Sequence, residues 1–107
     1  MSATEASAVT AAPRLSGILS ALITPYRADG SVNVAIIPAL VDRQLSQGLH
    51  GFYVGGSTGE AFLQSVEERI VVLRAVAAAA RGRATLIAHV GAIATQDCLR
   101  MGEVAAD

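Results

Sequence analysis

Short apolar segments alternate with segments of helical periodicity along this chain. The apolar segments span residues 17–24, 51–54 and 84–90, and each is followed by residues whose apolar positions recur at spacings of three and four. Strands that are apolar on both faces are typical of parallel sheets, whose crossover helices pack onto the strands. The alternation therefore predicts an α/β fold in which each strand of a parallel sheet is followed by a helix.

Capping signals predict where the three helices begin. Asn33 is the expected N-cap of the first helix, which runs to Gln47. Ser65 and Glu68 form an S-x-x-E capping box before the second helix, and Thr95 is the expected cap of the third. Each helix has an apolar stripe that is expected to pack on the sheet. The stripes are Ile37, Leu40, Val41 and Leu45 in the first helix, Ile70, Leu73, Ala77 and Ala80 in the second, and Cys98, Leu99 and Val104 in the third.

Three strand–helix units do not complete a barrel. A (β/α)8 TIM barrel needs eight units and about 250 residues, whereas this chain has 107. Three strands leave two open sheet edges, and helices on one side leave the other face of the sheet bare. The third helix also has no stop signal before Asp107. We therefore expect the first three units of a TIM barrel in residues 15–107, behind a disordered N-terminal tail in residues 1–14.

Composition excludes several classes of protein. The formal net charge is -1 and all 8 basic residues are arginine, so the basic excess of a nucleic-acid-binding surface is missing. A single cysteine, Cys98, excludes an internal disulfide framework, and no group of thiols and histidines suggests a metal site. Neither a membrane span nor a secretory signal is recognisable, so we expect a cytoplasmic protein with no membrane partner.

The loop after the second strand carries the most chemistry. Its sequence is Gly55-Gly56-Ser57-Thr58-Gly59-Glu60. Paired glycines let the backbone turn tightly and expose its N–H groups beside two hydroxyls, and such a concave nest of donors binds a carboxylate or a phosphate. At the end of a parallel strand the loop would lie at the rim where barrel active sites are built. An equally open reading is a plain flexible turn, since short Gly/Ser loops are common.

Three other motifs fit these residues poorly. G-x-S-x-G is the elbow of a nucleophilic serine, but a helix must follow the elbow at once, whereas here the capping box begins only at Ser65. A Walker loop needs Lys where this chain has Glu60. A dinucleotide fingerprint needs G-x-G-x-x-G, and the glycine spacing here differs.

Three segments of the chain resemble one family of enzymes. They are L-I-T-P-Y at 22–26, G-F-Y-V-G-G-S-T-G-E-A-F at 51–62 and L-I-A-H-V-G at 86–91. Over residues 15–107 the chain resembles the N-terminal third of the pyruvate-dependent class I aldolases, the family of dihydrodipicolinate synthase and N-acetylneuraminate lyase. Ser57 and the A-H-V-G run from Ala88 favour the sialic acid lyase branch.

The resemblance implies a fold, a reaction and a set of site residues. The fold is a TIM barrel, and a strand-six lysine forms a Schiff base with pyruvate without any cofactor or metal. The reaction cleaves N-acetylneuraminate into N-acetylmannosamine and pyruvate. Thr58 and the loop amides, including that of Gly56, would bind the pyruvate carboxylate, and Ser57 would bind substrate and relay a catalytic proton through a tyrosine of strand five. The partners implied are pyruvate and a sugar-derived 2-keto acid, and the full-length protein would be a homo-oligomer, a tetramer.

The chain departs from this pattern because it contains no lysine. Arginine cannot replace it, because a guanidinium stays protonated and is no nucleophile. Tyr26 and Tyr53 lie at the wrong positions to replace the missing tyrosine. The hypothesis is therefore that the polypeptide is a fragment, inactive alone, which supplies the carboxylate-binding loop. Dihydrodipicolinate synthase, another 2-keto acid aldolase of the family and a non-catalytic α/β binding module remain the alternatives.

Two further polar residues near the loop are expected to be structural. Glu60 is expected to accept backbone hydrogen bonds that fix the loop. His89, near the end of the third strand, is expected to be a hydrogen-bonded histidine of the core or rim, without a catalytic role.

Overall fold

The computed structural model describes residues 14–107 of the chain. Of the expected tail, residues 1–13 lie outside the described part, and Arg14 is exposed. The elements are, in order, β1 (Leu19–Ala21), η1 (Val34–Ile36), α2 (Ile37–Ser46), β2 (Gly51–Val54), η2 (Ala61–Leu63), α3 (Val66–Ala80), β3 (Thr85–Ala88) and α4 (Thr95–Ala106).

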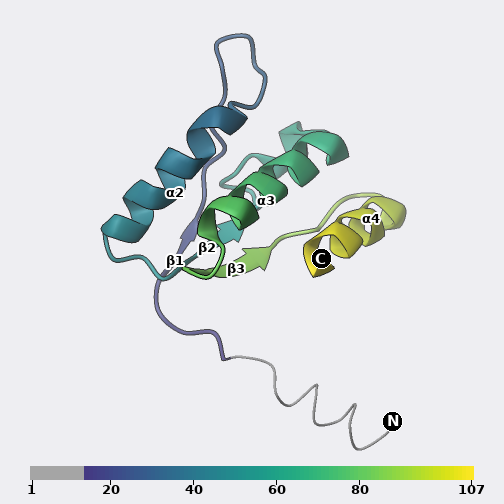
Figure 1. The fold of residues 1–107 in the computed structure, drawn as a ribbon. Coiled ribbons are helices and arrows are strands. Elements are labelled where there is room, and N and C mark those ends of the chain that lie inside the picture. The colour runs from purple at the N-terminus through teal and green to yellow at the C-terminus, as the bar shows by residue number, and fades with distance from the viewer. Residues whose placement is uncertain (1–13) are drawn as a thin grey trace, which may run out of the picture.

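The three strands form one parallel sheet in the order β1-β2-β3 (Figure 1). Phe52 of β2 pairs with Ser20 of β1 on one side and with Leu86 of β3 on the other. Within the described residues, the outer edges of β1 and β3 have no neighbouring strand. The expected fold class is confirmed: three consecutive parallel βα units form an open sheet.

The outer strands are shorter than the apolar segments that predicted them. β2 has the predicted bounds, but β1 covers three residues of 17–24 and β3 four of 84–90. Gly17 has a φ of +84°, which takes the chain out of the strand conformation. Beyond the strand ends the pairing continues as single hydrogen bonds, from the Leu22 amide to the Tyr53 carbonyl and from the His89 amide to the Val54 carbonyl.

The core lies between the sheet and two helices. α2 and α3 pack side by side on one face of the sheet, as Figure 1 shows. Ile37 and Val41 of α2 and Val76 of α3 are fully buried against Phe52 of β2. Burying each such side chain contributes about 1.5–3 kcal/mol. Tyr53, one position along β2 from Phe52, points to the opposite face of the sheet, where it remains half-buried.

Only one of the three predicted helix caps is present. The Ser65 hydroxyl accepts from the Glu68 amide at 3.1 Å and the Glu68 carboxylate accepts from the Ser65 amide at 2.9 Å, which confirms the capping box. The Asn33 side chain forms no cap, because residues 34–36 first make a 3-10 turn, and Pro38 lies in the first turn of α2. The N-cap of α4 is Ala94, so Thr95 is its first helical residue and its side chain caps nothing.

Two predicted apolar stripes are rotated. The buried side of α3 carries Arg69, Ile70, Val72, Val76 and Ala80, with the predicted Leu73 and Ala77 only half-buried. In α4 the buried residue is Met101, whereas the predicted Leu99 is 62% exposed. Both differences arise because periodicity gives the spacing of a stripe more reliably than the direction in which it faces.

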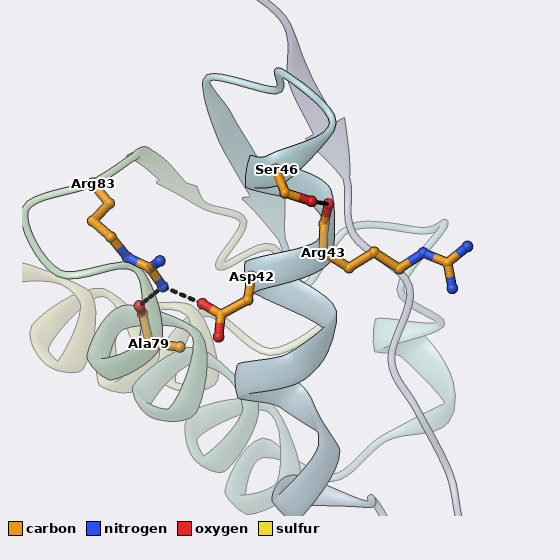
Figure 2. A network of polar contacts seen from close by, with 5 residues as sticks. All are labelled: Asp42, Arg43, Ser46, Ala79 and Arg83. Atoms are coloured by element: carbon orange, nitrogen blue, oxygen red, sulfur yellow. Dashed lines mark hydrogen bonds and ion pairs between the residues drawn. The ribbon is translucent and has the colours of Figure 1, made fainter.

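An exposed polar network joins α2 to the turn after α3 (Figure 2). Arg83 donates to the Asp42 carboxylate at 2.5 Å and to the Ala79 carbonyl at 2.6 Å. Ser46 closes the end of α2 by donating to the Arg43 carbonyl at 2.6 Å. Because the side chains of Arg83 and Asp42 are about half exposed, their ion pair contributes about 0–1 kcal/mol.

Candidate carboxylate-binding site

The loop between β2 and η2 folds as two overlapping turns. The Gly59 amide donates to the Gly56 carbonyl at 3.1 Å, and the Glu60 amide donates to the Ser57 carbonyl at 3.0 Å. Gly55 has a φ of +76°, a conformation in which an L side chain is strained. Glu60 adopts the left-handed conformation, with a φ of +61°, as the residue before η2. The loop is therefore held by its own backbone and is more than a loose linker.

Three consecutive amides of this loop have no acceptor within residues 14–107. They belong to Gly56, Ser57 and Thr58. The hydroxyls of Ser57 and Thr58 make no hydrogen bond to the described residues either, and both residues are exposed. Backbone donors in series beside free hydroxyls are suited to binding an anion. The arrangement can therefore bind the two oxygens of a carboxylate without an ionic partner.

The far end of the loop is fastened through the Gly59 carbonyl. It accepts from the Thr24 hydroxyl at 2.7 Å and from Gln64 Nε2 at 2.9 Å. The same Gln64 amide nitrogen donates to the Tyr26 hydroxyl at 2.7 Å. Side chains from the segment after β1 and from the end of η2 thus hold the loop over the carboxyl edge of the sheet.

The near end of the loop is fastened through the Gly55 carbonyl. His89 Nδ1 lies 2.8 Å from the Gly55 oxygen. Because a carbonyl oxygen only accepts, Nδ1 carries the proton and donates. This fixes the imidazole beside the loop, with its ring tilted 42° to the ring of Tyr53 at 5.8 Å.

Arg69 of α3 joins the loops that follow β2 and β3. Its guanidinium donates to the carbonyls of Gly91 at 2.7 Å, His89 at 3.1 Å and Gly55 at 3.4 Å. The residue is only 7% exposed, and its guanidinium carbon lies 5.9 Å from the centre of the Phe62 ring. Burial lowers the pKa of the Arg69 guanidinium, and the nearby Cys98 opposes that effect. Sequence reasoning missed Arg69; a basic residue one position before Ile70, beside the predicted apolar stripe, was the available signal.

The predicted site residues are placed as follows. Gly56 is buried at the base of the loop, where an added Cβ would lie 2.5 Å from the Tyr53 ring, and Ser57 and Thr58 lie at its exposed surface. The expected role of Glu60 is wrong: its side chain is exposed and accepts no hydrogen bond from residues 14–107, and its backbone conformation alone shapes the loop.

The described residues bring no three metal-ligating side chains together. In the same part of the chain no helix combines the length and the apolar character that a membrane crossing requires.

Comparison with known proteins gives consistent matches. The model of the dihydrodipicolinate synthetase family matches residues 14–107. An N-acetylneuraminate lyase of Rhizobium meliloti is 58% identical over 93 residues, which cover 87% of this chain and 31% of that protein. The structure of the Proteus mirabilis N-acetylneuraminate lyase matches with a TM-score of 0.83 and 40% identity, covering 87% of this chain and 32% of the other. A dihydrodipicolinate synthase from Aquifex aeolicus matches with a TM-score of 0.79 and 29% identity, covering 86% of this chain and 31% of the other. The chain thus spans about a third of the length of the curated relatives it matches.

Proposed function

Because the chain belongs to the dihydrodipicolinate synthetase family, we propose that it supplies the carboxylate-binding loop of a pyruvate-dependent carbon–carbon lyase. The observation that carries the proposal is the run of three amides, from Gly56 to Thr58, without acceptors in residues 14–107. The loop follows a parallel strand, at the edge of the sheet where barrel enzymes bind their substrates.

In the proposed mechanism the loop binds one end of a 2-keto acid. The Thr58 hydroxyl and the loop amides, including that of Gly56, donate to the carboxylate, and these neutral donors hold it in place. Ser57 also contacts the substrate and relays a proton through a tyrosine. By resemblance to the family, that tyrosine belongs to strand five and the lysine that forms the Schiff base to strand six, both outside these 107 residues, which contain no lysine. The iminium then accepts the electron pair of the carbon–carbon bond that breaks.

The proposed substrate is N-acetylneuraminate, cleaved to N-acetylmannosamine and pyruvate. Support comes from the relatives: among the solved structures, the Proteus mirabilis N-acetylneuraminate lyase is 40% identical to this chain, whereas the Aquifex aeolicus synthase is 29% identical. We further propose that the whole protein is a cytoplasmic homotetramer whose partners are pyruvate and a sugar-derived 2-keto acid. Light scattering of the whole protein tests the oligomeric state.

A hybrid enzyme tests the proposed role of the loop. In the hybrid, residues 15–107 replace the matched segment of the Rhizobium meliloti lyase, and pyruvate release from N-acetylneuraminate is measured. We expect an active hybrid, in which Ser57→Ala and Thr58→Val each lower kcat/KM by about 10- to 100-fold, because the first removes the hydroxyl that relays the proton and the second removes a donor to the carboxylate. The matched controls are Ser46→Ala in α2 and Thr95→Ala in α4, because the side chain of neither residue makes a hydrogen bond to the loop. Unchanged kinetics in both loop variants would contradict the proposal.

One alternative is a carboxylate-binding module without catalysis, for which the free loop amides alone would suffice. A folded hybrid that binds pyruvate but cleaves no N-acetylneuraminate would favour this alternative. A hybrid that condenses another aldehyde with pyruvate, and leaves N-acetylneuraminate intact, would favour a different aldolase of the family.

A further inference from the structure

The peptide group between Gly55 and Gly56 both anchors the start of the loop and supplies one of its free N–H donors. The carbonyl of this group, on Gly55, accepts from His89 and Arg69, while its N–H, on Gly56, has no acceptor within residues 14–107. No peptide bond in the described residues is cis, so the C=O and N–H of this group point in opposite directions. Fixing the carbonyl toward Arg69 therefore aims the N–H away from it.

The charge of Arg69 is compensated only by dipoles. Arg69 donates to the three backbone carbonyls of Gly55, His89 and Gly91, its Nη2 also lies 3.4 Å from His89 Nδ1, and it forms no ion pair with a carboxylate in residues 14–107. Its Nε is buried without a partner there. A buried cation of this kind normally has an acidic partner. Its position behind the Gly55 carbonyl leaves a positive field near the loop, which favours an anion on the opposite side.

Hydrogen bonds that share a peptide group polarise one another. Donation from a guanidinium to a carbonyl draws electron density from the same group, and its N–H becomes a stronger donor. His89 adds a second donor to the Gly55 oxygen at the shorter distance of 2.8 Å. Both contacts therefore strengthen the Gly56 N–H as a donor to an anion.

We infer that Arg69 is a positioning residue of the carboxylate site, which aims and polarises the Gly56 N–H through the Gly55 carbonyl. The inference rests on the proposed function, because it takes the ligand of the loop to be a 2-keto acid carboxylate. Arg69 touches no substrate in this scheme. It also ties the loop after β2 to the loop after β3, since its three acceptors come from both.

The test compares a charged ligand with a neutral one of the same shape. In the hybrid enzyme, inhibition of cleavage is measured with pyruvate and with its amide, pyruvamide. Arg69→Gln keeps an N–H donor and removes the charge, and we expect it to raise the Ki of pyruvate about tenfold. The Ki of pyruvamide is expected to change by less than about twofold, as for a surface substitution. The matched control is Arg74→Gln on the same helix, where Arg74 is exposed; both of its Ki values should stay unchanged.

A second variant keeps the test decisive where Arg69→Gln does not fold. Arg69→Lys retains the positive charge but loses the planar set of guanidinium N–H donors. The Ki of pyruvate for this variant should therefore rise by about threefold, while the Ki of pyruvamide should change less. Equal weakening of both ligands, or no weakening of pyruvate in either variant, would overturn the inference. Ser57→Ala and Thr58→Val distinguish a failure of this inference from a failure of the proposed function. If they weaken pyruvate while the Arg69 variants do not, only this inference fails; if they have no effect, the proposed function fails.

Discussion

The hydroxyl of Thr24, beyond the end of β1, donates a 2.7 Å hydrogen bond to the carbonyl of Gly59 in the loop after β2. Both residues are buried. A Cβ at Gly59 would lie 3.0 Å from the Leu22 carbonyl and 3.4 Å from the Thr24 hydroxyl. The loop therefore packs directly on the chain that leaves the first strand, and this contact fixes its far end.

Replacing Thr24 by valine should destabilise the protein without changing its shape. Thr24→Val keeps the side-chain volume and removes a buried hydrogen bond, while the Gly59 carbonyl keeps the Gln64 donor, so urea unfolding should show a loss of about 0.5–1.5 kcal/mol. The control is Thr85→Val in β3, because the Thr85 side chain makes no hydrogen bond to residues 14–107 and valine suits a strand. Equal stability of the two variants would show that the Gly59 contact contributes nothing.

Gly51 is required by close approach between strands. A Cβ there would lie 2.2 Å from the Thr85 carbonyl oxygen, so Gly51→Ala forces the backbones of β2 and β3 apart. We expect a loss of about 1–3 kcal/mol or more in thermal or urea unfolding. Gly102→Ala in α4 is the opposite case, because nothing lies within 4 Å of its Cβ position, and it should stabilise the protein by about 0.5–1 kcal/mol. Two shifts of the same sign would contradict this account.

Ser65 caps α3 through the capping box, whereas Thr95, the first residue of α4, caps nothing. Ser65→Ala removes the acceptor of the Glu68 amide, so we expect a loss of about 1 kcal/mol. Thr95→Ala in α4 should change the stability by less than about 0.5 kcal/mol, because its side chain caps nothing. Urea midpoints of both variants check the difference, and a larger effect at Thr95 would show that the caps are assigned wrongly.

An ion pair between α3 and α4 predicts a pH-dependent difference. The pKa of Glu67 lies below its ordinary value of 4.5. The main cause is the 2.7 Å hydrogen bond that its carboxylate accepts from Arg100, and a hydrogen bond from the Glu67 backbone amide adds to the effect. A lowered folded-state pKa means that the carboxylate stabilises the fold above 4.5 and that this contribution disappears as the pH falls through the folded value. Glu67→Gln should therefore be less stable than the parent at neutral pH and equal to it in strong acid.

The control for this prediction is Glu103→Gln in α4. Glu103 is exposed and forms no ion pair within residues 14–107. Its urea midpoint should follow that of the parent at both pH values. A Glu67→Gln variant that behaves like Glu103→Gln would show that the contact with Arg100 has no effect in solution.

Local signals predicted the parts of the fold that depend on local physics. β2 has its predicted bounds and the Ser65 capping box is present, because hydrophobic run length and reciprocal capping are set within a few residues. Asn33 and Thr95 failed as caps because a turn can begin one or two residues away at little cost in free energy. The preference of Asn or Thr for the N-cap position therefore does not reveal at which residue the helix begins.

The contacts that fasten the site were beyond sequence reasoning for a different reason. Arg69 reaches Gly91 across 22 positions and Gly55 across 14, and only the folded arrangement of two loops brings these carbonyls together. The composition of the loop itself, from Gly55 to Glu60, indicated an anion nest but was equally compatible with a plain flexible turn. Whether the loop amides lack acceptors depends on how the loop folds into its two turns. The sequence alone did not determine that conformation.

The crystal structure of the hybrid enzyme, reduced with borohydride in the presence of pyruvate, tests the central claim most directly. Our account predicts that the carboxylate oxygens of the trapped adduct lie about 2.7–3.2 Å from amides of the run Gly56–Thr58, that of Gly56 included. A trapped adduct whose carboxylate lies elsewhere, with water on those amides, would contradict it.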